Sequence, residues 1–339
     1  MSRVFDVAVV GVSSLVGEAL VSLLAERDFP LGKLYPLDAA DQAGGRVEFK
    51  GSHLRVADVA RFDFSQVQLA FFCASAAVAE VHVPRAAAAG CTIIDDSGLF
   101  RMEPDVPLVV AEVNPQVLAN VPRRIVANPN ACTVLLWTVL KPLHDAVGIE
   151  RIDVSTYQAV SGAEREGVEE LARQTANLLN MRPIENTVFS RQIAFNVLPQ
   201  IGSFEDNGYT REEMKMVWES DKIIGAGAPH MNPTTVRVPV FYGHAMSVHL
   251  ETREGITAEQ VRNLLKNAPG VEVVDRGQEE GYPTPVTEAS GEDAVFVGRI
   301  REDISRPRGI NLWIVGDNVR KGGALNCVQI AQILVKGYM

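Results

Sequence analysis

The sequence predicts an α/β fold in which an N-terminal doubly wound, parallel Rossmann-type sheet is followed by an α+β domain with a mixed or antiparallel sheet. Three observations lead to this prediction. The chain has 339 residues, more than one hydrophobic core usually serves, because single cores stop growing near about 250–300 residues. Short apolar β-prone runs alternate with helical segments up to about residue 130, and longer β-prone segments follow from Asp153 onward.

The first strand and helix are joined by a turn with a glycine at each end. Residues 4–12 (VFDVAVVGV) form an apolar, β-rich run, and residues 16–27 carry leucines at helical spacing, Leu20, Leu23 and Leu24. Between them, Gly11 and Gly17 bound a turn whose amides and helix N-terminus would hold a pyrophosphate. The spacing is not GxGxxG, so two glycines that only permit close strand–helix packing explain it as well.

The alternation of strands and helices continues through the first part of the chain. Apolar runs at residues 67–74 and 91–97 are separated by an alanine-rich helical stretch, as in a parallel sheet wrapped by helices. We therefore expect residues 1–130 to form a dinucleotide-binding domain and residues 131–317 a second domain. The last segment, 318–339, has apolar residues at helical spacing, and we expect it to complete the first domain.

Composition limits the possible partners and compartment. A net charge of −10 and a pI near 5.2 argue against nucleic acid, because Lys and Arg must neutralise phosphates, and favour a small metabolite. Four cysteines without CxxC spacing predict neither a metal site nor a disulfide framework. Reduced thiols predict a cytoplasmic protein. No apolar run reaches the roughly 18–20 residues of a membrane helix.

Several longer segments occur in a characteristic order. They are ANPN, TYQAVSGA, EEMKMVWESDKI, RVPVFYGH and DNVRKGGALN. In this order, and together with the Gly11 turn, they resemble the aspartate-semialdehyde dehydrogenase family almost from end to end. The resemblance implies a homodimer without a metal. It also implies an oxidoreductase of amino-acid biosynthesis that converts an aldehyde, phosphate and NAD or NADP to an acyl phosphate, through a cysteine thioester.

The resemblance implies a role for several polar residues that bind the substrate or move protons. His244 matches the family's acid/base residue, Gln158 contacts the substrate, and Arg237 binds its carboxylate. Glu219 faces the substrate ammonium group, while Arg101 and Lys222, with Asn130, bind phosphate. The partner would thus be a small anionic, amino-acid-like ligand.

Each of these assignments has a plainer explanation. His244 would otherwise be a core histidine bonded to the backbone, and Gln158 a solvated or strand-edge amide. Glu219 and Lys222 have the i, i+3 spacing of an exposed helical ion pair. Seven residues along an extended strand place Arg237 and His244 on opposite faces, so both reach one site only if the chain bends, and Gly243 is the expected place.

The resemblance also implies a set of cofactor contacts, at Gly11, Ser13, Ser14, Gly17, Ser161, Gly162 and Asn318. Two positions depart from the family. Ser14 replaces a glycine at which the backbone approaches phosphate, and Asp41 stands where an arginine for the 2′-phosphate of NADP is expected. Asp38 and Asp41 repel a phosphate and accept from a ribose hydroxyl, so they favour NAD if a dinucleotide binds. Both could equally be solvated loop carboxylates.

The principal departure lies at the nucleophile. The family has Asn-Pro-Asn-Cys, whereas this chain has Asn-Pro-Asn-Ala, with Ala131 at the nucleophile position and Cys132 one residue later. Two hypotheses follow. The first is a working dehydrogenase that uses Cys132 from a displaced position. The second is a catalytically silent paralogue, a pseudoenzyme that keeps the anionic amino-acid pocket as a binding or regulatory homodimer.

The local helix geometry bears on this choice. Pro129 followed by an apolar run predicts a helix that begins near Asn130 or Ala131. Successive side chains on a helix point about 100° apart, so a one-residue shift turns the thiol substantially. We expect Ala131 to face His244, and Cys132 to act as a small apolar residue at the helix start.

Overall fold

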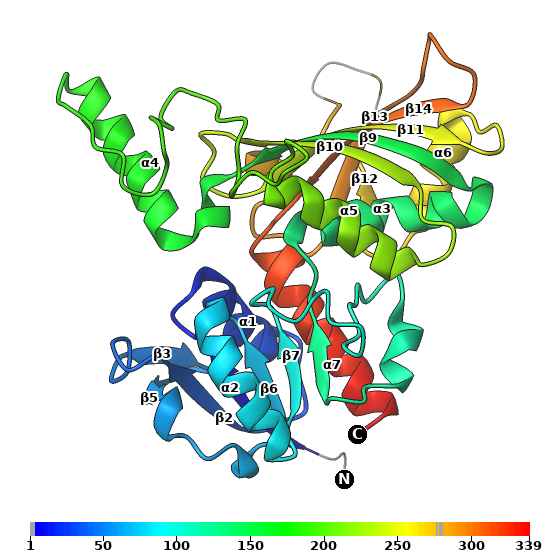
Figure 1. Ribbon diagram of the computed structural model, residues 1–339. Helices are drawn as coiled ribbons and strands as arrows, with labels where there is room; N and C mark the ends of the chain where they lie inside the picture. The colour runs from blue at the N-terminus through cyan, green and yellow to red at the C-terminus, as the bar shows by residue number, and fades with distance from the viewer. Residues whose placement is uncertain (1–3, 276, 278–280) are drawn as a thin grey trace. The chain divides into compact units, whose positions relative to one another are not determined.

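The computed structural model describes residues 4–275, 277 and 281–339 of the chain. It divides into two compact units (Figure 1). The first unit comprises residues 4–129 and 323–339, and the second unit comprises residues 130–322. Within the described residues, no helix is both long enough and apolar enough to cross a membrane.

The first unit is built on a six-stranded sheet in the order β5-β2-β1-β6-β7-β8, in which every pair is parallel. The strands are β1 (Phe5–Val10), β2 (Leu31–Asp38), β5 (Ala57–Asp58), β6 (Leu69–Phe72), β7 (Thr92–Asp95) and β8 (Ile125–Ala127). A hairpin of β3 (Arg46–Phe49) and β4 (Ser52–Arg55) lies outside this sheet. The helices are α1 (Leu15–Glu26), α2 (Ala76–Ala88) and α7 (Asn326–Gly337). The expected doubly wound parallel sheet is confirmed.

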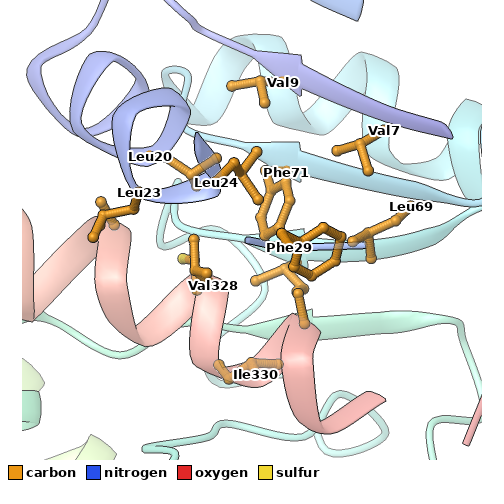
Figure 2. Close-up of a cluster of buried hydrophobic side chains, with 14 of the residues drawn as sticks. Val7, Val9, Leu20, Leu23, Leu24, Phe29, Leu69, Phe71, Val328 and Ile330 are labelled. Atoms are coloured by element: carbon orange, nitrogen blue, oxygen red, sulfur yellow. The ribbon is translucent and has the colours of Figure 1, made fainter. Parts of the chain in front are cut away.

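One face of this sheet is covered by α1 and α7, which come from opposite ends of the chain (Figure 2). Val328 and Ile330 of α7 belong to the same buried cluster as Leu20 of α1 and Phe71 of β6. Alternate residues along β1 contribute to this cluster, because successive side chains of a strand point to opposite faces. Helix α2 packs against β6 and β7 without joining the cluster. The C-terminal helix begins at Asn326, after a π-helical turn at Arg320–Leu325, and not at residue 318.

The second unit contains a six-stranded mixed sheet, as expected, in the order β10-β9-β11-β14-β13-β12. The strands are β9 (Ile149–Gln158), β10 (His230–Arg237), β11 (His244–Thr252), β12 (Val271–Val273), β13 (Val295–Glu302) and β14 (Gly309–Gly316). The pairs β9–β10 and β12–β13 are parallel, and the others are antiparallel. Helices α3 (Ala131–Val147), α5 (Arg211–Ile224) and α6 (Ala258–Lys266) pack on one face, while α4 (Glu164–Leu179) extends from the sheet edge (Figure 1).

The chain bends sharply between β10 and β11. Gly243 has φ +86°, and a Cβ there would lie 2.6 Å from the carbonyl oxygen of Pro285, so both the conformation and the space require glycine. Arg237 ends β10 opposite Gln158, and His244 begins β11, next to the residue that pairs with Tyr157. The bend expected at Gly243 therefore brings Gln158, Arg237 and His244 to one end of the sheet.

Candidate active site

The N-terminus of α3 is fixed by Asn130, whose side-chain oxygen accepts a hydrogen bond from the backbone N–H of Cys132 at 2.8 Å. Asn is a favoured capping residue because its side chain satisfies an otherwise unpaired amide of the first helical turn. The helix begins at Ala131, as expected. Ala131 is half-buried, whereas Cys132 is completely buried. The Ala131 methyl group packs against Gly322, where an added Cβ would lie only 2.5 Å from it.

Two buried carboxylates of α5 hold the same asparagine. The backbone N–H of Asn130 donates to Glu219 at 2.7 Å, and its side-chain amide donates to Glu212 at 2.8 Å. Gln158 also donates to Glu212, at 3.3 Å. Burial raises the pKa of Glu212, but the Lys215 cation and the Asn130 hydrogen bond outweigh burial and leave that pKa below its ordinary value. Glu212 thus gives the site a buried carboxylate that stays ionised at neutral pH.

Arg237 and His244 form the opposite, donor-rich side of the site. Arg237 donates from Nη1 to the carbonyl of Ala159 at 2.8 Å, and burial lowers its pKa, with Glu212 opposing this shift. The backbone N–H of Ala159 donates to Nδ1 of His244 at 3.2 Å. A Cβ added to Gly162 would lie 2.6 Å from Nη1 of Arg237 and 3.5 Å from Cε1 of His244. Only glycine therefore leaves room beside these two side chains.

The hydrogen bond to His244 determines which ring nitrogen carries the proton. Because Nδ1 accepts from the backbone, the neutral ring must carry its proton on Nε2. Burial and the Arg237 cation lower the pKa of His244 well below 6.5, against the effect of a backbone hydrogen bond at Gly243. In this tautomer the neutral ring can donate from Nε2 to a ligand oxygen.

The thiol of Cys132 is not activated by these groups. Burial raises its pKa well above the ordinary range, and the charge of Glu212 raises it further, while Arg237 opposes the rise. Within the described residues, no hydrogen bond joins its sulfur to His244. A thiolate is the nucleophilic form, so this environment disfavours the reactive form of Cys132.

Two further predicted site residues, Ser161 and Asn318, belong to a buried polar group in the second unit. Asn318 donates to Ser161 at 3.1 Å, and its side-chain oxygen accepts from the backbone N–H of Gly243 at 3.1 Å. This group anchors the bend that precedes His244. The arrangement accounts for both residues structurally, with or without a bound cofactor.

In the first unit, the glycine-bounded turn is closed by its own side chains. Gly11 has φ +81°, and a Cβ there would lie 2.6 Å from the carbonyl oxygen of Cys73; a Cβ at Gly17 would lie 2.2 Å from that of Gly11. Ser14 caps α1: its hydroxyl accepts from the Gly17 N–H at 3.0 Å and donates to the Gly11 carbonyl at 2.8 Å. An amide that could bind a pyrophosphate is therefore already occupied.

Asp38, the last residue of β2, and Asp41, in the following loop, differ in their surroundings. Asp38 is buried, and its carboxylate accepts from both the backbone N–H and the hydroxyl of Ser13 and from the N–H of Ala39. Asp41 is exposed, and the hydrogen bond to its carboxylate from within the described residues comes from the Gln42 side-chain amide at 3.4 Å. Two carboxylates thus stand at the end of β2 and in the loop that follows it.

Arg101 lies in the first unit, in a cluster that follows β7. Its guanidinium donates to the Asp96 carbonyl at 3.3 Å, and it lies 3.8 Å from the Asp96 carboxylate. Asp96 also accepts from Asn128 at 2.7 Å, and Asn128 accepts from Asn326 at 2.6 Å. Asp96 thus neutralises part of the charge that a phosphate would use.

Comparison with known proteins agrees with this architecture. Residues 6–121 match the model for the semialdehyde dehydrogenase NAD binding domain, and residues 140–321 match the model for the semialdehyde dehydrogenase dimerisation domain. An aspartate-semialdehyde dehydrogenase from a Shewanella strain is 52% identical over 339 residues, which is 100% of both chains. The chain belongs to the aspartate-semialdehyde dehydrogenase family.

Solved structures of the family extend the agreement to three dimensions. The Vibrio cholerae aspartate semialdehyde dehydrogenase II, complexed with ASA, is 51% identical and has a TM-score of 0.97, with 100% of both chains covered. A probable aspartate-semialdehyde dehydrogenase from Pseudomonas aeruginosa is 44% identical, with a TM-score of 0.95 over 99% of this chain and 100% of that one. The fold of the family is therefore retained throughout.

Two features of the site differ from what the sequence predicted: Glu212 belongs to the site, and Glu219 is not exposed. Glu212 is linked to Asn130, Gln158 and Lys215, yet it was not among the predicted site residues. Its position seven residues before Glu219, two turns along the same helix face, is the signal that could have found it. The exposed ion-pair explanation for Glu219 is wrong, because Glu219 is 1% exposed. Lys222, in the last turn of α5, is half-buried.

Proposed function

We propose that this chain is a catalytically silent member of the family that binds a small anionic, amino-acid-like ligand in its second unit. The observation that carries the proposal is the environment of Cys132, a completely buried thiol with a raised pKa, beside an alanine at the nucleophile position. A methyl group cannot attack an aldehyde, so the side chain at position 131 provides no nucleophile.

The remaining groups supply complementary contacts for such a ligand. Arg237 has the planar, forked donor set that suits a carboxylate. Glu219 is a buried anion that suits an ammonium group, and His244 adds a donor at Nε2. Within the second unit, Lys222 and Asn130 are proposed to bind phosphate where a ligand carries one. The ligand is held without being converted, and its binding would serve regulation or sequestration.

Cofactor and assembly belong to the same proposal. We expect NAD to bind better than NADP, if either binds, because Asp38 and Asp41 place negative charge near the 2′-position of the ribose. The turn bounded by Gly11 and Gly17 would hold the pyrophosphate, and Ser161, Gly162 and Asn318 the nicotinamide end. We expect a homodimer formed through the sheet of the second unit, which carries the family's dimerisation domain.

A working dehydrogenase is the second candidate, and the 52% identity to named enzymes over the whole chain favours it. A steady-state assay with aspartate semialdehyde, phosphate and either NAD or NADP separates the two. We expect no turnover by the native chain and measurable turnover by the Ala131→Cys variant. Turnover by the native chain that Cys132→Ser abolishes would refute silence, whereas Cys132→Ser should leave ligand binding nearly unchanged.

A further inference from the structure

Arg237 has more hydrogen-bonding capacity than the protein uses. Its side chain is buried, with 6% of the residue exposed, yet the described residues provide one hydrogen bond, from Nη1 to Ala159, and no carboxylate within ion-pair distance. A guanidinium has five N–H donors. Buried charges are normally paired or fully hydrogen-bonded, because removing them from water is costly. An anionic ligand would supply the missing partners.

Arg237 also lines a partly open cavity of about 270 Å³, whose wall is formed mainly by the segment following α4. The apolar part of the lining consists of Ala163, Val188, Phe189, Leu198 and Ile201, and the polar part includes Ser190 and Gln200. None of Gln158, Glu219 and His244 lines this cavity. It is therefore a recess distinct from the amino-acid site, and the two share Arg237.

The wall of this recess is held in place by α4. Glu170 is fully buried, and its carboxylate accepts from the backbone N–H groups of Thr187, Val188 and Phe189. On the other side, Leu198 and Arg237 exchange backbone hydrogen bonds at 2.8 and 2.9 Å. The recess is thus built from preorganised backbone, which lowers the cost of ordering it around a ligand.

We propose that this recess binds the apolar body of a small monocarboxylic acid whose carboxylate is bound by Arg237. The apolar walls match an aromatic or branched aliphatic chain. The volume of about 270 Å³ lies slightly below the roughly 300–1,000 Å³ typical of ligand pockets, so the acid must be small. This inference rests on the proposed function in one respect, the binding of a carboxylate by Arg237. It adds a class of ligand larger and less polar than an aspartate derivative.

Calorimetric titration of the full-length protein with 3-phenylpropanoate, acetate and L-aspartate tests the proposal. We expect 3-phenylpropanoate to bind at least about tenfold more tightly than acetate, because only its ring fills the recess. The Arg237→Ala substitution should abolish the binding of both 3-phenylpropanoate and acetate. Equal affinities for 3-phenylpropanoate and acetate would overturn the proposal.

A filling substitution locates the binding. Ser190→Trp should weaken 3-phenylpropanoate at least about tenfold and leave L-aspartate within twofold, whereas Arg191→Trp, at an exposed neighbour outside the lining, should change neither. If the Ser190→Trp variant fails to fold, Gln200→Leu provides a second test. It makes the lining more apolar and should tighten the binding of 3-phenylpropanoate without changing that of L-aspartate. Unchanged or parallel effects on the two ligands would contradict a distinct recess. If 3-phenylpropanoate binds but L-aspartate does not, the result counts against the proposed function and not against the recess.

Discussion

The chemical reactivity of the cysteines follows directly from their burial. All four are buried: Cys73 is 7% exposed, and Cys91, Cys132 and Cys327 are 0% exposed. Burial raises the pKa of Cys91 to about 12, and it raises the pKa values of Cys132 and Cys327 well above the ordinary range. We expect the native protein to react with none of its thiols on the time scale of minutes.

The size of the effect can be estimated from the pKa of Cys91. The rise from 9.0 to about 12 reduces the thiolate fraction near pH 8 roughly 1000-fold. The pKa of Cys132 is likewise raised well above its ordinary value, and its side chain is completely buried, so a reagent cannot reach the sulfur. A disulfide reagent such as DTNB should therefore release almost no thiolate from the native protein and four equivalents after unfolding in guanidinium.

The Ala131→Cys variant provides a matched comparison. A thiol at this half-buried first position of α3 lies at a helix N-terminus, which lowers a thiol pKa. We expect one additional, fast-reacting equivalent, mapped to residue 131 by mass spectrometry after alkylation. Rapid stoichiometric labelling of Cys132 in the native chain would refute the reasoning and restore the displaced-nucleophile hypothesis.

Three other predictions concern the turn, the acidic core and the recess wall. Ser14→Gly frees the Gly17 N–H and should tighten NAD binding at least about threefold by calorimetry; weaker or equal binding would contradict self-capping. Burial raises the pKa of Asp95 to about 6, with hydrogen bonds from Ser97 opposing. Its contribution to stability is therefore present below 3.8 and is lost as the pH rises to about 6. Urea unfolding should show that Asp95→Asn removes a fall of about 3 kcal/mol over this interval; an identical pH profile would exclude the shift. Glu170→Gln should cost about 2 kcal/mol in unfolding free energy, whereas exposed Glu169→Gln should cost almost nothing, and equal losses would refute the role of Glu170.

The architecture could be predicted because it depends on patterns that extend over many residues. The strand–helix alternation and the helical spacing of Val328 and Ile330 predicted the parallel sheet and the packing of the C-terminal helix in the first unit. The bend at Gly243 was predictable because opposite strand faces cannot otherwise present Arg237 and His244 together. The exact start of α7 was not predictable, because residues 320–325 form a π-helical turn that the spacing of apolar residues does not indicate.

The details of the site depend on contacts between residues far apart in the chain. Whether Asp38 would accept from a ribose or from the turn itself could not be read from the sequence, and the structure places it on Ser13. The tautomer of His244 depends on the backbone of Ala159, 85 residues away. The burial of Glu219 likewise follows from the packing of α5, and helical spacing alone suggested an exposed pair.

The retention of the site residues has a structural cause as well as a functional one. Glu212 accepts from Asn130 and Gln158 and pairs with Lys215 at 3.3 Å, so each holds the others in a buried position. Loss of one partner would leave a buried charge or amide unsatisfied, at about 1–3 kcal/mol or more. Selection for stability would therefore keep this network in a chain that has alanine at position 131. The retained residues are compatible with either hypothesis, and the environment of Ala131 and Cys132 is what distinguishes them.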